Sequence, residues 1–322
     1  MKELKLWQFI EKKLADHESL VFMCVLESHG SSPGRQGFKM AVGETEIYGS
    51  IGGGIMEHKF VEMAKEKLVE EQKISLTKKQ IHNKSAKQNQ SGMICSGEQT
   101  IFLYPMQEKE LKHVKSIIDA LQQNKNGLLE INSDGIYFYD KLIPESDYRF
   151  EKKSEQIWEY EEKLGYKNFL YIIGGGHCSL ALSRIMSSMD FYVQVFDERK
   201  NLNTMTQNTF AHRTEELKSF ELIKSKVPEH KNNYLVIMTF GYRTDGIVLR
   251  ELMHQQYRYL GVLGSKTKIE KLREELNAEG VEQEIMDAIH APIGIQIKSQ
   301  TPEEIAVSIA AEIIQVKNSK ME

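Results

Sequence analysis

The segment "YIIGGGHCSLAL", residues 171–182, decides the fold of the second half of this chain. An apolar run leads into three glycines, and apolar residues at helical spacing follow them. A βα unit needs a tight turn at such a place, where free backbone N–H groups at the start of the helix can bind an anion. We therefore expect a strand, a glycine turn and a helix in direct succession.

The residues around this turn predict a nucleotide site. Two of the glycines start a G-x-G-x-x-G/A spacing, and a small residue stands at its third position. Asp197 ends the next apolar run, where a carboxylate can accept from a ribose hydroxyl, and Arg199 could instead contact a 2′-phosphate. His177 could bind a phosphate or cap the helix. The predicted site residues are Gly174, Gly176, His177, Ser179 and Asp197.

Four apolar runs organise the second half: "FLYIIG", "FYVQVFD", "YLVIMTF" and "YLGVLGS", separated by helical patterns. Runs of this kind are typical of parallel strands buried on both faces. The fold class is α/β, with an N-terminal mixed α/β domain followed by a Rossmann-like doubly wound parallel sheet. For the 322 residues we predict a first domain at 1–150, a linker at 151–167 and the Rossmann-like domain at 168–322.

A second glycine run, "GSIGGGIMEHKF" at residues 49–60, opens a helix from Ile55. Its backbone N–H groups could hold a phosphate, and Glu57, at the third helical position, could cap the helix or contact a ligand. The loop 30–37 adds side-chain donors suited to a phosphate or a pterin edge. Taken alone, this region reads as a tight turn more readily than as a site. Its candidate residues are Ser31, Ser32, Arg35, Gly52, Gly53, Gly54 and Glu57.

Composition excludes several classes of protein. The 42 Lys and Arg residues against 46 Asp and Glu residues include no long basic block, so nucleic-acid binding is not expected. No apolar run has the length of a membrane span, and the N-terminus reads as an amphipathic helix, not a signal peptide. The three cysteines lack a disulfide spacing, which favours a cytoplasmic location. Cys95 lies in a polar loop and is the one thiol expected to contact a soft metal or sulfur. The alternative for this thiol is a purely structural role.

Three stretches together resemble one family: "GSSPGRQGFKM", "GSIGGGIME" and "GVLGSKTKIEKLREEL" with "TPEEIAVSIAAEI". They are similar to the XdhC/CoxI family of xanthine dehydrogenase accessory factors. The resemblance implies a chaperone that binds molybdenum cofactor, as molybdopterin or its dinucleotide form, and delivers it to a molybdenum hydroxylase apoenzyme. It implies a cysteine desulfurase as a further partner, and we expect a homodimer, the commonest assembly. We expect the loops 30–37, 49–54 and 91–97 to converge on one face.

The chain departs from the family pattern at three places. Cys95 is followed by Ser96 where the family has glycine, Phe240 stands where it has histidine, and Lys298 replaces a glycine. An NAD(P)-dependent oxidoreductase is the alternative function, with NAD(P) as its cofactor. Phe240 occupies the place where such an enzyme would hold a proton donor, so a maturation factor is the better reading and no catalytic residue is assigned.

Overall fold

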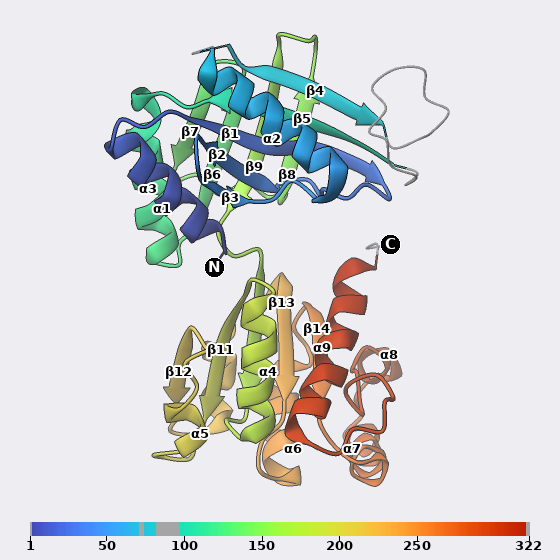
Figure 1. The fold of residues 1–322 in the computed structure, drawn as a ribbon. Helices are drawn as coiled ribbons and strands as arrows, with labels where there is room; N and C mark the ends of the chain where they lie inside the picture. The colour runs from blue at the N-terminus through green and yellow to red at the C-terminus, as the bar shows by residue number, and fades with distance from the viewer. Residues whose placement is uncertain (1, 71–73, 82–96, 320–322) are drawn as a thin grey trace. The chain divides into compact units, whose positions relative to one another are not determined.

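The computed structural model describes residues 2–70, 74–81 and 97–319 of the chain. The chain divides into two compact units, Met1–Gly165 and Tyr166–Glu322. Both are drawn in Figure 1. In the described part of the chain, no helix combines the length and apolar character needed to cross a bilayer.

The first unit contains two antiparallel sheets and three α-helices in its described residues. One sheet has the strand order β3-β2-β1-β5-β4, and the other has the order β7-β6-β9-β8. Its elements are α1 (Lys2–Ala15), β1 (Leu20–Gly30), β2 (Lys39–Gly43), β3 (Ile47–Gly49), α2 (Gly54–Val69), β4 (Leu76–Ile81), β5 (Gly97–Pro105), η1 (Glu108–Glu110), α3 (Leu111–Gln122), β6 (Gly127–Asn132), β7 (Gly135–Tyr139), β8 (Tyr148–Lys152) and β9 (Trp158–Leu164).

Strand β1 is the centre of this unit because both of its faces are buried. Successive side chains of a strand point to opposite faces, and here Val21 and Met23 pack with α2. Phe22 and Cys24 pack on the other face, in a core that α1, α3 and the second sheet share. The continuous apolar run of β1 thus joins two cores.

A buried ion cluster ties β2 to β9 and α1. The Lys39 ammonium lies 2.7 Å from a carboxylate oxygen of Glu162 and 2.7 Å from one of Glu3. Burial works to lower the pKa of Lys39, but the two carboxylates outweigh it and raise this pKa. The hydroxyl of Tyr160 donates to Glu162 at 2.8 Å, so the charges are also hydrogen-bonded. Such pairing is what allows charges to stay inside a core.

The predicted linker at 151–167 is wrong in its main part. Strand β9 lies inside this interval and pairs with β6 and β8, so these residues belong to the first unit. The prediction failed because "WEYEEKL" is rich in charge, as a half-exposed strand can be. Its alternate residues Trp158 and Tyr160 are buried, while Glu159 and Glu161 lie on the more exposed face.

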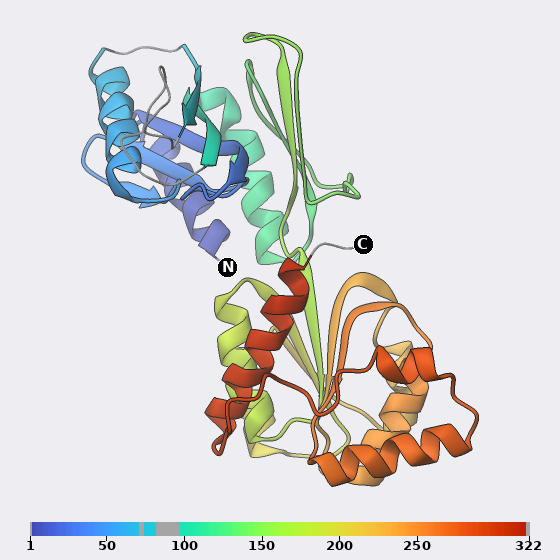
Figure 2. The ribbon, with the colours of Figure 1, turned by 90° about the vertical axis from the view of Figure 1, so that its right-hand side faces the viewer.

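The second unit is a five-stranded parallel sheet with the order β12-β11-β10-β13-β14. Helices α4 and α9 cover one face, and α6, α7 and α8 cover the other (Figure 2). Its elements are β10 (Asn168–Ile173), α4 (His177–Ser188), β11 (Phe191–Asp197), α5 (Asn203–Thr206), β12 (Arg213–Glu216), η2 (Phe220–Ser225), β13 (His230–Ile237), α6 (Tyr242–Leu252), β14 (Tyr257–Val262), α7 (Lys266–Ala278), α8 (Gln283–Asp287) and α9 (Pro302–Asn318).

The strand order confirms the predicted fold class, a doubly wound Rossmann-like sheet after a mixed α/β domain. The chain leaves β10 toward β11 and β12 on one side, and then returns to β13 and β14 on the other. The direction of winding therefore reverses between β10 and β13. In open α/β sheets, ligands bind at the carboxyl ends of the strands at this switch point.

Candidate functional site: the glycine turns of the two units

The three glycines after β10 have different surroundings. Gly174 has φ +116°, and a Cβ atom placed on it would lie 2.1 Å from the carbonyl oxygen of Met238, which follows β13. A Cβ atom on Gly175 would lie 2.5 Å from Cγ of Met205. Gly176 is the N-cap of α4 with φ −76°, and a Cβ atom on it would meet nothing within 4 Å. The first two glycines serve the fold, whereas the third leaves open space at a helix N-terminus.

Asp197 lies at the predicted place, but its carboxylate is fully engaged inside the protein. Oδ2 accepts from the backbone N–H of Gly175 at 2.7 Å and from Nη2 of Arg199 at 2.7 Å. Oδ1 accepts from the backbone N–H and Nε of Arg199, both at 2.9 Å. Burial works to raise the pKa of Asp197, but these hydrogen bonds lower it overall. A ribose hydroxyl could bind this carboxylate only by displacing one of these donors.

The guanidinium of Arg199 lies at the carboxyl ends of the strands, where the crevice of an open α/β sheet binds its ligands. Its carbon Cζ lies 4.9 Å from the ring centroid of Phe240, which follows β13. The side chain of Arg199 is 35% exposed and Phe240 is 54% exposed, so this stacked pair is open to solvent. Because β10 lies between β11 and β13, the pair spans the carboxyl end of β10.

Two further predicted residues differ in their access to a ligand. His177 is exposed as the first residue of α4. Ser179 is only 1% exposed, so it cannot line the crevice as predicted. Its hydroxyl has no hydrogen-bond partner among the described residues. Burial at this position fits the third small residue of the motif, which permits close packing between helix and sheet.

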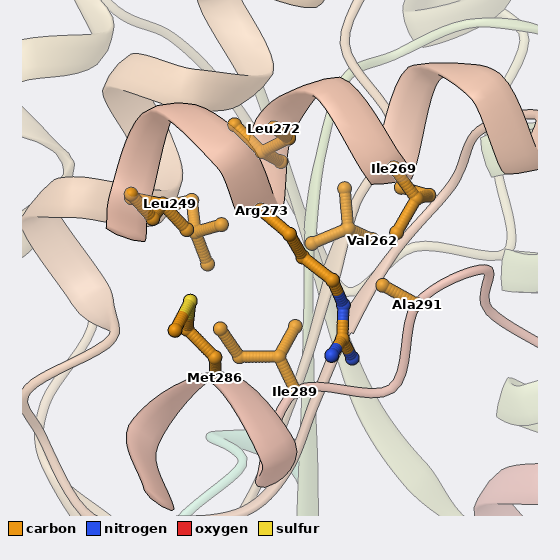
Figure 3. A pocket seen from close by; sticks show the side chains of 9 residues that line it. Leu249, Val262, Ile269, Leu272, Arg273, Met286, Ile289 and Ala291 are labelled. Carbon is orange, nitrogen blue, oxygen red and sulfur yellow. The ribbon is translucent and has the colours of Figure 1, made fainter. Parts of the chain in front are cut away.

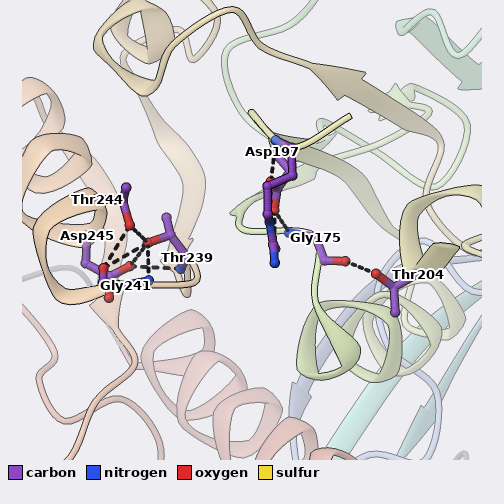
Figure 4. A network of polar contacts seen from close by, with 8 residues as sticks. Gly175, Asp197, Thr204, Thr239, Gly241, Thr244 and Asp245 are labelled. Atoms are coloured by element: carbon purple, nitrogen blue, oxygen red, sulfur yellow. Dashed lines mark hydrogen bonds and ion pairs between the residues drawn. The ribbon is translucent and has the colours of Figure 1, made fainter. Parts of the chain in front are cut away.

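Sequence reasoning missed a polar network after β13. The carboxylate of Asp245 is buried and accepts from the backbone N–H of Thr239 at 2.8 Å and from its hydroxyl at 2.6 Å. The ammonium of Lys268 also donates to Asp245, and the hydroxyls of Thr239 and Thr244 lie 2.5 Å apart. Figure 4 shows the contacts among Thr239, Thr244 and Asp245 together with the Asp197 cluster, in which the Thr204 hydroxyl donates to the carbonyl of Gly175. Polar residues directly after an apolar run were the signal in the sequence.

In the first unit, the predicted convergence of loops is confirmed for its described part. The backbone N–H of Gly34 donates to Oε1 of Gln99 at 3.0 Å. A Cβ atom on Gly52 would lie 2.4 Å from the Gly34 nitrogen, and one on Gly97 would lie 2.6 Å from the Ser32 nitrogen. The loop 30–37 therefore touches both the glycine run and the start of β5. Residues 91–96, with the predicted Cys95, lie outside the described residues.

Glu57 occupies the donors of the first glycine run. Its Oε2 accepts from the Ser50 hydroxyl at 2.6 Å and from the backbone N–H groups of Ile51 and Gly53 at 2.9 Å. Partial burial works to raise the pKa of Glu57, but these bonds lower it overall. Because α2 begins at Gly54, Glu57 is the fourth helical residue, one later than predicted. The glycine run thus binds an internal carboxylate with donors that the alternative, a phosphate site, would have required.

The side chains of the loop 30–37 divide into two kinds. Ser32 is buried, and its hydroxyl donates to the carbonyl of Gly34 at 2.6 Å, which is a structural role. Ser31 and Arg35 are exposed, and Nη1 of Arg35 donates to the carbonyl of Gly30 at 3.0 Å. Of the predicted donors in this loop, only Ser31 and Arg35 are placed to meet a ligand.

Two other features bear on where a cofactor or a metal could bind. Figure 3 shows a cavity lined by apolar side chains such as Leu249, Leu272 and Met286, with Arg273 beside it. Its volume of about 10 Å³ has room for about one water molecule, which is too small for a cofactor. Among the residues that the structure describes, no group of three His, Cys, Asp or Glu side chains is placed to hold a metal ion.

The switch point between β10 and β13, with its glycine turn, defines the second unit as a Rossmann domain. A mixed α/β domain precedes it in the chain. Residues 170–313 match the family model described as the XdhC Rossmann domain, and residues 14–77 match that of the XdhC and CoxI family. The chain belongs to the XdhC and CoxI family.

Two curated relatives and one solved structure resemble the chain. It is 32% identical over 159 residues to the uncharacterized protein YqeB of Escherichia coli (strain K12), covering 48% of this chain and 28% of that protein. It is 27% identical over 157 residues to a probable xanthine dehydrogenase subunit of Bacillus subtilis (strain 168), covering 48% and 45%. The matches thus span less than half of these relatives. A crystal structure of a xanthine dehydrogenase from Bacillus halodurans has a TM-score of 0.71 at 22% identity, covering 98% of this chain and 97% of that one. This similarity shows that the two chains share a fold.

Proposed function

We propose that this protein is a maturation factor that binds molybdenum cofactor and delivers it to an apoenzyme of the xanthine dehydrogenase type. Membership of the XdhC and CoxI family supports this role. The name of the Bacillus subtilis relative supports the choice of client, although the match spans only part of that protein.

The observation that carries the proposal is the open position at Gly176. Molybdenum cofactor has a phosphate at one end, and an anion is stabilised at a helix N-terminus by free N–H groups and the helix dipole. At Gly176 the backbone of α4 is accessible, because a Cβ atom there would meet nothing within 4 Å. The guanidinium of Arg199, 35% exposed and paired with Asp197, offers further N–H donors at the same strand ends. These two features support a phosphate-bearing cargo at this place.

The first unit carries candidate donors of its own. Since Glu57 already accepts from the N–H groups of Ile51 and Gly53, these donors are side chains. Ser31 and Arg35 are exposed beside the glycine run and carry hydrogen-bond donors that suit a pterin edge.

A delivery role requires protein partners. We propose the hydroxylase apoenzyme and a cysteine desulfurase as partners, and a homodimer as the working form. The alternative, an NAD(P)-dependent oxidoreductase, is supported less well, because Phe240 offers no proton beside the crevice.

The test is cofactor retention by protein purified from a molybdate-supplied host. Pterin is measured by fluorescence after oxidation, molybdenum by mass spectrometry, and delivery by activation of a xanthine dehydrogenase apoenzyme. Gly176→Val places a side chain where the phosphate would approach, and we expect it to weaken pterin retention by about tenfold or more, equivalent to about 1.4 kcal/mol.

The matched control is Ser188→Val, at the exposed far end of the same helix, which we expect to retain pterin like the wild type. Wild-type protein free of both pterin and molybdenum would refute the proposal. So would equal retention by Gly176→Val and the wild type.

A further inference from the structure

We infer that the Rossmann crevice also prefers a nucleotide whose adenosine ribose carries a 2′-phosphate, and that Arg199 is the residue that sets this preference. The inference rests on the proposed function in two respects: a phosphate at the glycine turn at Gly176, and the donors of Arg199 beside it.

The first step is the state of the Asp197 carboxylate. A residue at the end of the second strand of a Rossmann unit reads the adenosine ribose, and an acidic one accepts from its free hydroxyls. A carboxylate has about four acceptor positions, and Asp197 already accepts from Gly175 and three times from Arg199. A free ribose diol would therefore compete with bonds inside the protein.

The second step is the set of donors that Arg199 leaves available. A guanidinium carries five N–H donors, and the described contacts of Arg199 use Nε and Nη2 on Asp197. Within the described residues, Nη1 has no acceptor. A phosphate dianion is the ligand that the remaining donors recognise best, because the bonds are charge-assisted and can be bidentate.

The third step is the rigidity of this group. The guanidinium is held on one side by a salt bridge to a fully buried carboxylate, at 2.7 Å. Phe240 stacks against it at 4.9 Å from the neighbouring strand end. A fixed donor plane loses little freedom when it binds, and this raises its selectivity for a ligand of matching geometry.

The test compares NADP⁺ with NAD⁺, and 2′,5′-ADP with 5′-ADP, by isothermal titration of the full chain. We expect the wild type to bind the 2′-phosphorylated member of each pair about tenfold more tightly or better. Arg199→Ala should remove this preference and improve NAD⁺ binding, because Asp197 is then free to accept from the ribose. Arg184→Ala is the matched control, since Arg184 also stacks on an aromatic ring, Phe210, at 5.6 Å, but lies within α4 past the turn.

If Arg199→Ala does not fold, Arg199→Lys serves instead. It keeps the charge, loses the planar pair of donors, and should retain only part of the preference. Equal wild-type affinity for NADP⁺ and NAD⁺, an unchanged ratio in the Arg199 variant, or no binding of any probe would each overturn the inference. Pterin retention and hydroxylase activation are separate readouts, so the maturation role can fail or stand independently of this outcome.

Discussion

Alanine substitutions along the glycine turn should give three different losses of stability. At Gly174, a Cβ atom would lie 2.1 Å from the Met238 carbonyl oxygen and 2.8 Å from the Thr239 nitrogen, which are backbone atoms that cannot turn aside. The positive φ adds strain of about 1–3 kcal/mol, and the forced shift adds about 1–3 kcal/mol. We expect Gly174→Ala to lower the free energy of unfolding of the second unit by about 2–6 kcal/mol.

The other two glycines should tolerate alanine better. Gly175→Ala meets the flexible side chain of Met205 and should cost about 1–2 kcal/mol. The Cβ atom added by Gly176→Ala would contact no other atom within 4 Å. The only loss of stability is therefore the preference for glycine over alanine at an N-cap, about 0.5–1 kcal/mol.

Urea unfolding followed by circular dichroism measures these differences, together with hydrogen exchange of the β10 and β13 amides. Both tryptophans, Trp7 and Trp158, lie in the first unit, so their fluorescence reports on that unit alone. A Gly174→Ala protein as stable as the wild type would refute the close approach of the two strand ends. A Gly176→Ala protein as unstable as Gly174→Ala would refute the open space from which the phosphate site is argued.

Three further predictions concern the first unit. Glu57→Ala should destabilise it by about 1–3 kcal/mol at neutral pH. Because the pKa of Glu57 is lowered in the folded protein, the stabilisation by this carboxylate is complete above the ordinary glutamate pKa and is lost as the pH falls through the folded pKa. The urea unfolding curves of the wild type and the variant should therefore converge in acid. Lys39→Met should lower the free energy of unfolding by about 3–5 kcal/mol, since it leaves buried carboxylates without their cation. The double variant Lys39→Met with Glu162→Gln should recover part of this stability. Equal stability of the single and double variants, measured by tryptophan fluorescence, would contradict this. Burial raises the pKa of Cys24 to about 12, so iodoacetamide should label it only after unfolding, and labelling of the native protein, seen by peptide mass spectrometry, would show that this core is open.

Local pattern was sufficient for the architecture of the second unit. The apolar runs and the glycine turn predicted parallel strands and a helix N-terminus, because burial on both faces and tight turns depend on residues close in the chain. The strands of the first unit were harder to predict. Strand β9 carries charge on its half-exposed face, so only its pairing with β6 reveals it as part of a sheet.

The sequence by itself determined that Asp197 ends a strand beside the glycine turn and that Glu57 opens a helix after the other glycine run. Only the tertiary structure decided what their carboxylates bind. Asp197 is saturated by Gly175 and Arg199, and Glu57 holds the donors that a phosphate would have used. Hydrogen bonds form at distances near 3 Å between groups whose positions depend on the whole packed chain, so the sequence can place a donor or acceptor on an element without showing whether it is still free.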